Sequence, residues 1–184
     1  MKYKRLYIVR KDLHMSSGKI AAQLSHCSEI FWLRMIKREL FKGDQKYYSD
    51  LILEPNLVEG YIKGAITKTV CQAKNKNQLM KAKTLAENCG LVEGEDFGFV
   101  NDNCLTELTP ENADGTTTTA FWTAPIPESI AKQISCKYNL YTDDIKLSKW
   151  IEEKGILKCS KCGETVEHIS KYCPNCGAPM QIKE

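Results

Sequence analysis

The stretch that decides the fold is residues 6–27, LYIVRKDLHMSSGKIAAQLSHC. Its first four residues are strand-forming, and a polar turn follows in which Ser16 and Ser17 are candidate helix N-caps. Residues then recur at helical spacing, at Ile20, Gln23, Leu24 and Cys27. Lys19 therefore stands in the first turn of a helix that opens off a strand. Free backbone N–H groups, the helix dipole and the ammonium predict a phosphate site there, the alternative being a lysine that faces water.

The rest of the chain continues this alternation of strands and helices. The first helix is predicted to run to about Phe41. β-Branched and aromatic residues predict further strands at 65–73, 97–100 and 116–123, and apolar spacing predicts helices at 75–89 and up to about Cys136. The β-α-β-α-β-β-α order predicts an α/β fold with three layers, in which a mixed sheet of four strands has helices on both faces.

Size and composition allow one sizeable core and a small appendage in 184 residues. No apolar run is long enough to cross a membrane and no signal peptide is recognisable, so we expect a cytoplasmic protein without a membrane partner. The net charge is only +3. Five basic residues in the first eleven suit a polyanion such as tRNA, although a solvated surface explains them equally well.

Residues 157–184 contain two Cys-x-x-Cys pairs, Cys159, Cys162, Cys173 and Cys176. Four thiolates close a tetrahedral shell, which predicts one structural Zn²⁺ in a small zinc-ribbon tail; an iron–sulfur site or a redox dithiol pair are the alternatives. Gly163 and Gly177 follow the pairs and allow tight turns around the metal. His168 lies between the pairs and is expected to be a bystander. A closed shell cannot activate water, so the tail is not expected to be catalytic.

Two stretches resemble the type-2 peptidyl-tRNA hydrolase family. The first is V-R-K-D-L-x-M-S-S-G-K-I-A-A-Q-x-S-H at the N-terminus, and in the second, residues 100–118, Asp102, Thr106, Gly115, Thr116 and Thr118 keep the family pattern. Leu105 stands where the family has arginine and Glu107 where it has glutamine. The resemblance covers about residues 3–141 and implies a hydrolase-like domain at 1–141. A linker at 142–156, partly helical around 147–151, would then join it to the ribbon at 157–184.

The resemblance implies hydrolysis of the ester of peptidyl-tRNA or an N-blocked aminoacyl-tRNA, with no metal needed for catalysis and a homodimeric assembly. Lys19 would neutralise a phosphate or the oxyanion, Asp102 would orient or activate water, and His26, on the same helix face as Lys19, would relay protons or contact RNA. The remaining implied residues are hydroxyl donors (Thr106, Thr118) and substrate-binding positions (Arg10, Gly18, Gln23, Thr116).

Two other functions stay open on the sequence. Leu105 replaces a bidentate anion ligand and Glu107 adds negative charge, which favours a catalytically weakened domain that binds RNA or protein with its zinc ribbon. A zinc-dependent redox protein would need labile cysteines in the tail.

Overall fold

Strand β1 (Tyr3–Arg10) lies at the centre of the larger unit of the chain, because its last six residues are buried on both faces. Leu6 and Ile8 belong to one apolar core, whereas Tyr7 and Val9 belong to a second. The chain divides into two compact units, Met1–Tyr141 and Thr142–Glu184. This computed structural model describes residues 2–37, 53–142, 148–153, 155–178 and 180–181.

The sheet is mixed, as the sequence predicts. Strand β1 pairs in parallel with β2 (Lys68–Ala73) and antiparallel with β4 (Thr117–Thr123), and β4 pairs antiparallel with β3 (Phe97–Asp102). Two strands of two residues, β5 (Ile126–Pro127) and β6 (Asn139–Leu140), add to the four predicted ones. The strand order is β3-β4-β1-β2-β6, with β5 beside β1.

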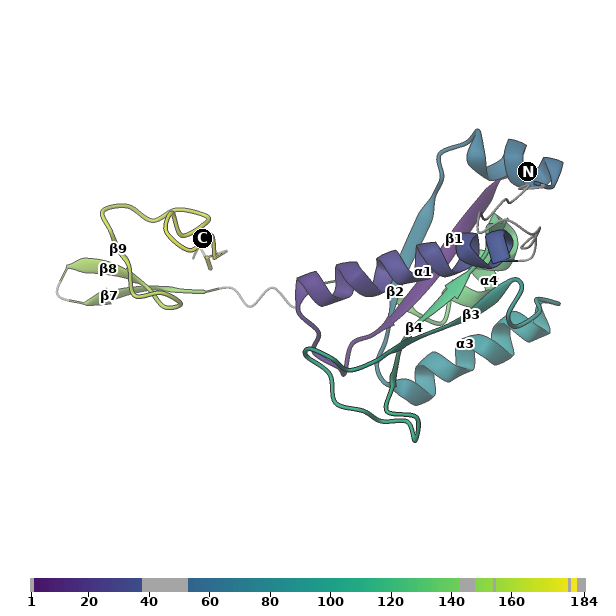
Figure 1. Cartoon of the computed structure of the whole chain (residues 1–184). Helices are drawn as coiled ribbons and strands as arrows, with labels where there is room; N and C mark the ends of the chain where they lie inside the picture. The colour runs from purple at the N-terminus through teal and green to yellow at the C-terminus, as the bar shows by residue number, and fades with distance from the viewer. Residues whose placement is uncertain (1, 38–52, 143–147, 154, 179, 182–184) are drawn as a thin grey trace, which may run out of the picture. The chain divides into compact units, whose positions relative to one another are not determined.

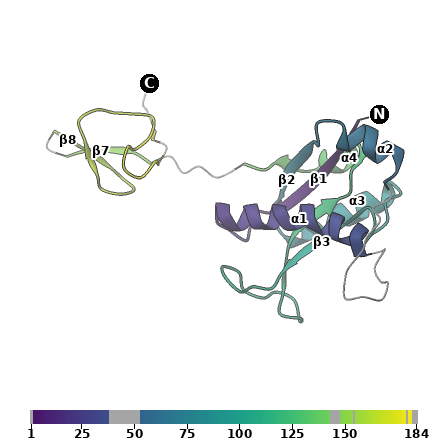
Figure 2. The same cartoon turned by 45° about the horizontal axis from the view of Figure 1, so that its top comes forward.

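Helices cover both faces of this sheet, which confirms the three layers (Figures 1 and 2). The long helix α1 (Ser17–Lys37) packs on the core of Tyr7 and Val9. On the other face, α3 (Lys76–Asn88) and α4 (Glu128–Ser135) cover the core of Leu6 and Ile8. A short helix α2 (Pro55–Leu57) leads into a π-helical turn, η1 (Val58–Ile62). The predicted end of the first helix, near residue 41, lies outside the described residues.

A β-bulge interrupts the pairing of β3 with β4. Val100 is opposite Ala120, but the next residue, Asn101, is opposite Thr118, so Thr119 has no partner on β3. A bulge changes the direction of the side chains that follow it. This irregularity lies next to the site described below and determines which threonines reach it.

The second unit is a three-stranded antiparallel sheet of β7 (Trp150–Glu153), β8 (Ile156–Cys159) and β9 (Thr165–Val166). Strand β7 occupies part of the segment for which we expected a helical linker, and residues 143–147 lie outside the described residues. The reason is local: β7 pairs along its whole length with β8, and the Trp150 indole donates to the Ser170 carbonyl at 3.1 Å. None of the described helices has the length and apolar content needed to cross a membrane.

Candidate active site

Helix α1 begins where the sequence predicts. The Ser16 hydroxyl accepts a hydrogen bond from the Lys19 backbone N–H at 3.2 Å, and the Ser16 carbonyl accepts from Ile20 at 2.9 Å. Ser16 is thus the N-cap, and Lys19 lies in the first turn of the helix. Gly18 has open space around it, since an added Cβ would meet only the Ser16 hydroxyl at 3.9 Å.

The side chain of Lys19 reaches the end of β3. Its Nζ lies 2.8 Å from Asp102 Oδ2 and donates to Thr106 Oγ1 at 3.0 Å. Both members of the ion pair are largely buried, with Lys19 12% and Asp102 9% exposed. An ammonium carries three N–H donors, and contacts with the described residues occupy two of them, which leaves one for a ligand. The structure therefore brings together three residues that the sequence assigns to one site.

Gln23 supports this ion pair from within the protein. Gln23 lies one turn after Lys19 in α1 and is fully buried. Its amide donates to Asp102 Oδ2 at 2.7 Å, and its carbonyl oxygen accepts from the Thr119 hydroxyl at 2.6 Å. Gln23 thus fixes the orientation of Asp102 and offers no surface to a substrate, in contrast to the binding role that the family resemblance implies.

Asp102 is held as a carboxylate. Burial alone would raise its pKa, but hydrogen bonds from Lys19, the Cys104 backbone N–H and Gln23 outweigh that effect and hold the pKa below its ordinary value. The Cys104 N–H reaches Oδ1 at 2.9 Å, so both oxygens are engaged. A carboxylate with a lowered pKa is a weak base, and its main effect here is to fix the ammonium and nearby dipoles.

Glu107 occupies the start of α1, where the sequence predicts a site for an external anion. Its carboxylate accepts from the Ser16 backbone N–H at 2.9 Å and also from the Ser16 hydroxyl. These hydrogen bonds, together with the charge of Lys19, lower the pKa of Glu107. The family departure at this position therefore places the chain's own negative charge at the helix terminus.

A groove of about 450 Å³ opens beside the ion pair. Lys19, Asp102 and Thr106 form one part of its lining, and His26 also borders it, which agrees with the shared helix face predicted for Lys19 and His26. His26 is half exposed, with its Nδ1 4.0 Å from Glu29. Seven residues along a helix correspond to about 10 Å of rise between the two backbones, and a part for His26 in proton relay or RNA contact stays a prediction.

Three other predicted residues belong to a separate network beside the first turn of α3. Arg10 is 3% exposed and donates to Asp12, to Glu111 at 2.6 Å and 2.9 Å, and to the Thr118 carbonyl. Burial lowers the pKa of Arg10, but its hydrogen bonds to Glu111 and Asp12 raise it above the ordinary value. The guanidinium is thus committed to internal carboxylates.

The two remaining threonines lie in the same network. Thr118 donates to Asn101 at 2.9 Å, and Thr116 accepts from Asn112 at 2.9 Å and donates to Asp114. The bulge at Thr119 explains this separation, because it turns Thr119 toward Gln23 and leaves Thr118 on the Asn112 side. The sequence does not predict that Thr119 contacts Gln23 or that the Cys104 backbone N–H contacts Asp102. The alternation of residues along a strand reveals neither a bulge nor a backbone donor.

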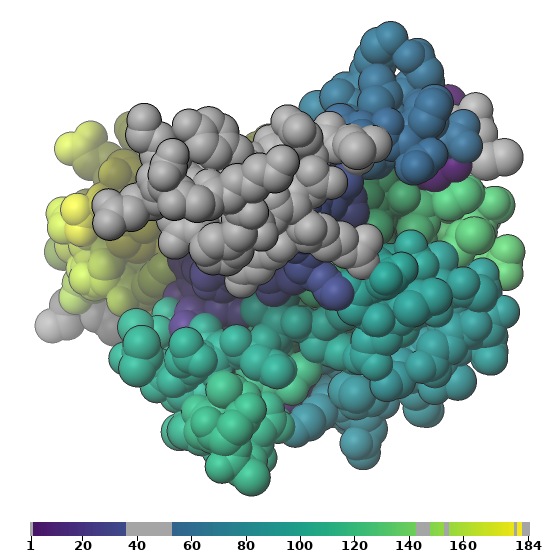
Figure 3. Space-filling model, turned by 45° about the vertical axis from the view of Figure 1, so that its right-hand side comes forward, coloured from purple at the N-terminus to yellow at the C-terminus, as the bar shows by residue number. Residues whose placement is uncertain are grey.

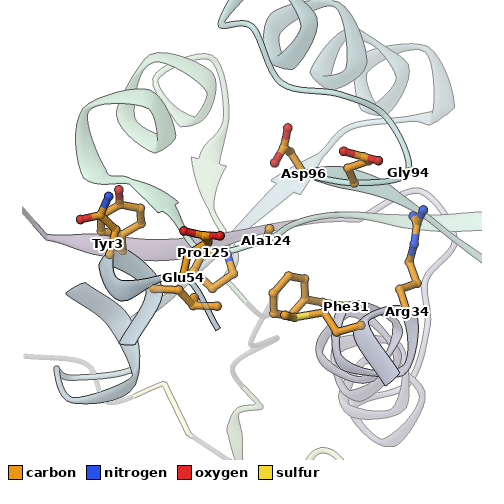
Figure 4. A pocket seen from close by; sticks show the side chains of 12 residues that line it. Tyr3, Phe31, Arg34, Glu54, Gly94, Asp96, Ala124 and Pro125 are labelled. Atoms are coloured by element: carbon orange, nitrogen blue, oxygen red, sulfur yellow. The ribbon is translucent and has the colours of Figure 1, made fainter. Parts of the chain in front are cut away.

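A second cavity, of about 420 Å³, lies near the end of α1 (Figure 4). Phe31 and Arg34 of α1 face it, together with Tyr3 of β1 and Asp96 from the loop before β3. It contains none of the residues that the sequence assigns to catalysis or binding.

The second unit contains the predicted cysteine cluster. All four sulfur atoms lie within 4.8 Å of one another, with Cys159 to Cys176 at 3.9 Å and Cys162 to Cys173 at 3.7 Å. A tetrahedral ion with bonds of about 2.3 Å to sulfur would separate the sulfurs by about 3.8 Å, so the arrangement fits such an ion. Gly163 and Gly177 have positive φ angles of 75° and 67°, as the predicted tight turns require.

Comparisons with known proteins agree with this division. A family model described as peptidyl-tRNA hydrolase PTH2 matches residues 3–141, and one described as a zinc-ribbon domain matches residues 158–180. The chain is 28% identical over 134 residues to a peptidyl-tRNA hydrolase of Thermococcus sibiricus, covering 73% of this chain and 93% of that protein. It is 34% identical over 108 residues to a peptidyl-tRNA hydrolase of Methanopyrus kandleri, covering 59% and 76%.

A solved structure of a protein of unknown function, Atu0240 from Agrobacterium, is 10% identical in sequence to this chain. The match covers 77% of this chain and 99% of that one. Its TM-score of 0.40 is too low to support an argument about the fold or the site. The match over residues 3–141 accounts for most of the chain and includes Lys19, Asp102 and Thr106. The chain therefore belongs to the PTH2 family of peptidyl-tRNA hydrolases and carries a zinc-ribbon domain at its C-terminal end.

Proposed function

We propose that the larger unit hydrolyses the ester of peptidyl-tRNA at the groove beside Lys19 and Asp102. Family membership supplies the reaction, in which water adds to the carbonyl carbon of the ester. The bond from that carbon to the ribose oxygen then breaks, and the ribose oxygen takes up a proton from the water, which leaves a free carboxyl group on the peptide. The single observation that carries the location is the Lys19 ammonium, fixed between Asp102 and Thr106 with one N–H donor left over. A preorganised donor of this kind is what a developing oxyanion requires.

Each polar group then has a distinct task. Lys19 donates to the carbonyl oxygen as it becomes negative. The Thr106 hydroxyl accepts from Lys19, so its own proton is available for the same oxygen or for the attacking water. Asp102 keeps the ammonium in position and orients the water by its charge. Gln23 and Thr119 act indirectly: Gln23 donates to Asp102, and Thr119 donates to Gln23.

The substrate implies tRNA as a partner, and the ribbon implies a metal. We propose that the four cysteines hold one Zn²⁺, because a set of four thiolates with these separations suits that ion. The ion would contribute folding energy to the second unit, and its closed shell leaves no position for substrate. Homodimerisation stays a prediction from the family resemblance, and a cytoplasmic location stays a prediction from the sequence alone.

The test is hydrolysis of N-acetyl-aminoacyl-tRNA by the purified, metal-loaded chain. Asp102→Asn preserves the shape of the side chain and removes the charge, so we expect kcat/KM to fall about 100-fold. Asp114→Asn is the matched control, since Asp114 is exposed and, in the part of the chain that the structure describes, forms its hydrogen bonds with Thr116 of the same loop. No turnover by the folded wild-type chain, or equal rates for the two variants, would overturn the proposal.

A further inference from the structure

The groove beside the ion pair has an aliphatic wall that the proposed chemistry does not use. Ile30 and Leu33 of α1 line it, together with Leu105 from the segment that follows β3. Leu105 is 87% exposed and Leu33 is 49% exposed. Two exposed leucines from different elements line one groove and leave apolar surface that a ligand would cover. The whole segment between β3 and β4 projects from the body of the unit (Figure 3).

The charges that line the groove indicate what kind of group fits there. Lys19 is the only Lys or Arg of the described residues lining it, and Asp102 neutralises that cation. Glu29 adds a negative charge near His26. A phosphodiester chain would meet no unpaired ammonium or guanidinium along this wall, whereas an uncharged apolar group would meet Leu33 and Leu105.

The position of the groove relates this wall to the reacting bond. The ester carbonyl, held at Lys19, has the ribose on one side and the acyl residue on the other. We propose that the groove receives the acyl side and that Leu105 and Leu33 make the enzyme select peptides whose tRNA-linked residue has an apolar side chain. This proposal rests on the hydrolysis assigned above. The volume of about 450 Å³ is in the range of small-molecule sites and exceeds one side chain, so the start of the peptide also fits.

The experiment uses one tRNA acylated with N-acetyl-leucine, N-acetyl-glycine or N-acetyl-aspartate, so that the RNA is constant. We expect kcat/KM for the leucyl substrate to exceed that for the glycyl and aspartyl substrates about tenfold. Leu105→Asn should reduce the preference about threefold, with a larger loss on the leucyl substrate. Leu140→Asn is the matched control, because Leu140 is 64% exposed on β6 and does not line the groove.

A binding measurement separates this proposal from the proposed activity. The probes are non-hydrolysable 3′-amide adenosine analogues that carry N-acetyl-leucine or N-acetyl-glycine, titrated into the full chain. Tighter binding of the leucyl analogue that weakens in Leu105→Asn supports the groove even if no ester is cleaved, in which case only the hydrolase assignment falls. Equal binding and equal rates for leucyl and glycyl compounds, or equal losses for both in Leu105→Asn, would overturn the proposal.

Discussion

Replacement of Gln23 by methionine tests whether the buried amide holds the site together. Gln23→Met keeps the length of the side chain and removes two hydrogen bonds, one to the charged Asp102 at 2.7 Å and one from Thr119 at 2.6 Å. A bond to a charged group contributes about 1.5–3 kcal/mol and a neutral one about 0.5–1.5 kcal/mol. Methionine regains part of this by apolar burial. We therefore expect the free energy of unfolding to fall by about 2 kcal/mol.

Thr119 would keep one acceptor in Gln23→Met, the Val100 carbonyl at 3.2 Å, and Asp102 would keep Lys19 and the Cys104 N–H. The site would thus loosen without losing its charges. Because Gln23 is one of the donors that lower the pKa of Asp102, that pKa should move upward toward its ordinary value.

The assay is urea unfolding of the full chain, followed by far-ultraviolet circular dichroism, which reports mainly on the three long helices of the larger unit. Gln133→Met is the matched control, since Gln133 is exposed on α4 and should change stability by less than about 0.5 kcal/mol. A melting temperature lowered by about 6 °C in Gln23→Met would accompany the expected loss. Equal stability of the two variants would refute the supporting role of the amide.

Three further predictions concern other parts of the chain. Arg10→Met leaves Asp12 without its cation and Glu111 with only the longer ion pair to Lys76, at 3.9 Å, among the described residues. Since both carboxylates are about one-third exposed, we expect a loss of about 2 kcal/mol in urea unfolding, and no loss would contradict a structural role for Arg10. Cys162→Ser, or a strong chelator, should release one zinc ion per chain in elemental analysis and change the fluorescence of Trp150, which packs on the cysteine cluster; a chain without bound metal when purified would contradict the zinc assignment. The pKa of Asp102 is lower in the folded protein than its ordinary value of about 3.9, so the carboxylate contributes stability and activity above that value. This contribution is lost as the pH falls through the pKa of the folded protein. The pH profile of kcat/KM, measured where the protein stays folded, should therefore show no loss from Asp102 above about pH 4.

The fold could be predicted because its local signals agree with one another. The Ser16 cap, the helical spacing after it and the β-branched strands all point to one alternation, and the structure confirms it. The predicted helix around residues 147–151 is the exception. Strand pairing of β7 with β8 sets the structure of residues 150–151, and such pairing is a tertiary effect that a short charged sequence does not reveal.

The candidate site was only partly accessible from the sequence. Lys19 and Asp102 meet because both lie where an element starts or ends at the same edge of the sheet. The bulge at Thr119 was not predictable, and it explains why Thr118 joins Arg10 in a separate network. The burial of Gln23 was equally hidden, since a glutamine in an amphipathic helix ordinarily faces water.

The most direct test of the central claim is the single-turnover rate of ester cleavage in Lys19→Met, beside Lys63→Met. Lys63 is an exposed lysine whose only described ion pair is with Glu59. We predict that Lys19→Met lowers the rate of the chemical step about 100- to 1,000-fold while Lys63→Met leaves it unchanged, because the proposed mechanism places Lys19, and not Lys63, at the ester carbonyl. A Lys19→Met protein that folds normally and cleaves at the wild-type rate would contradict the account.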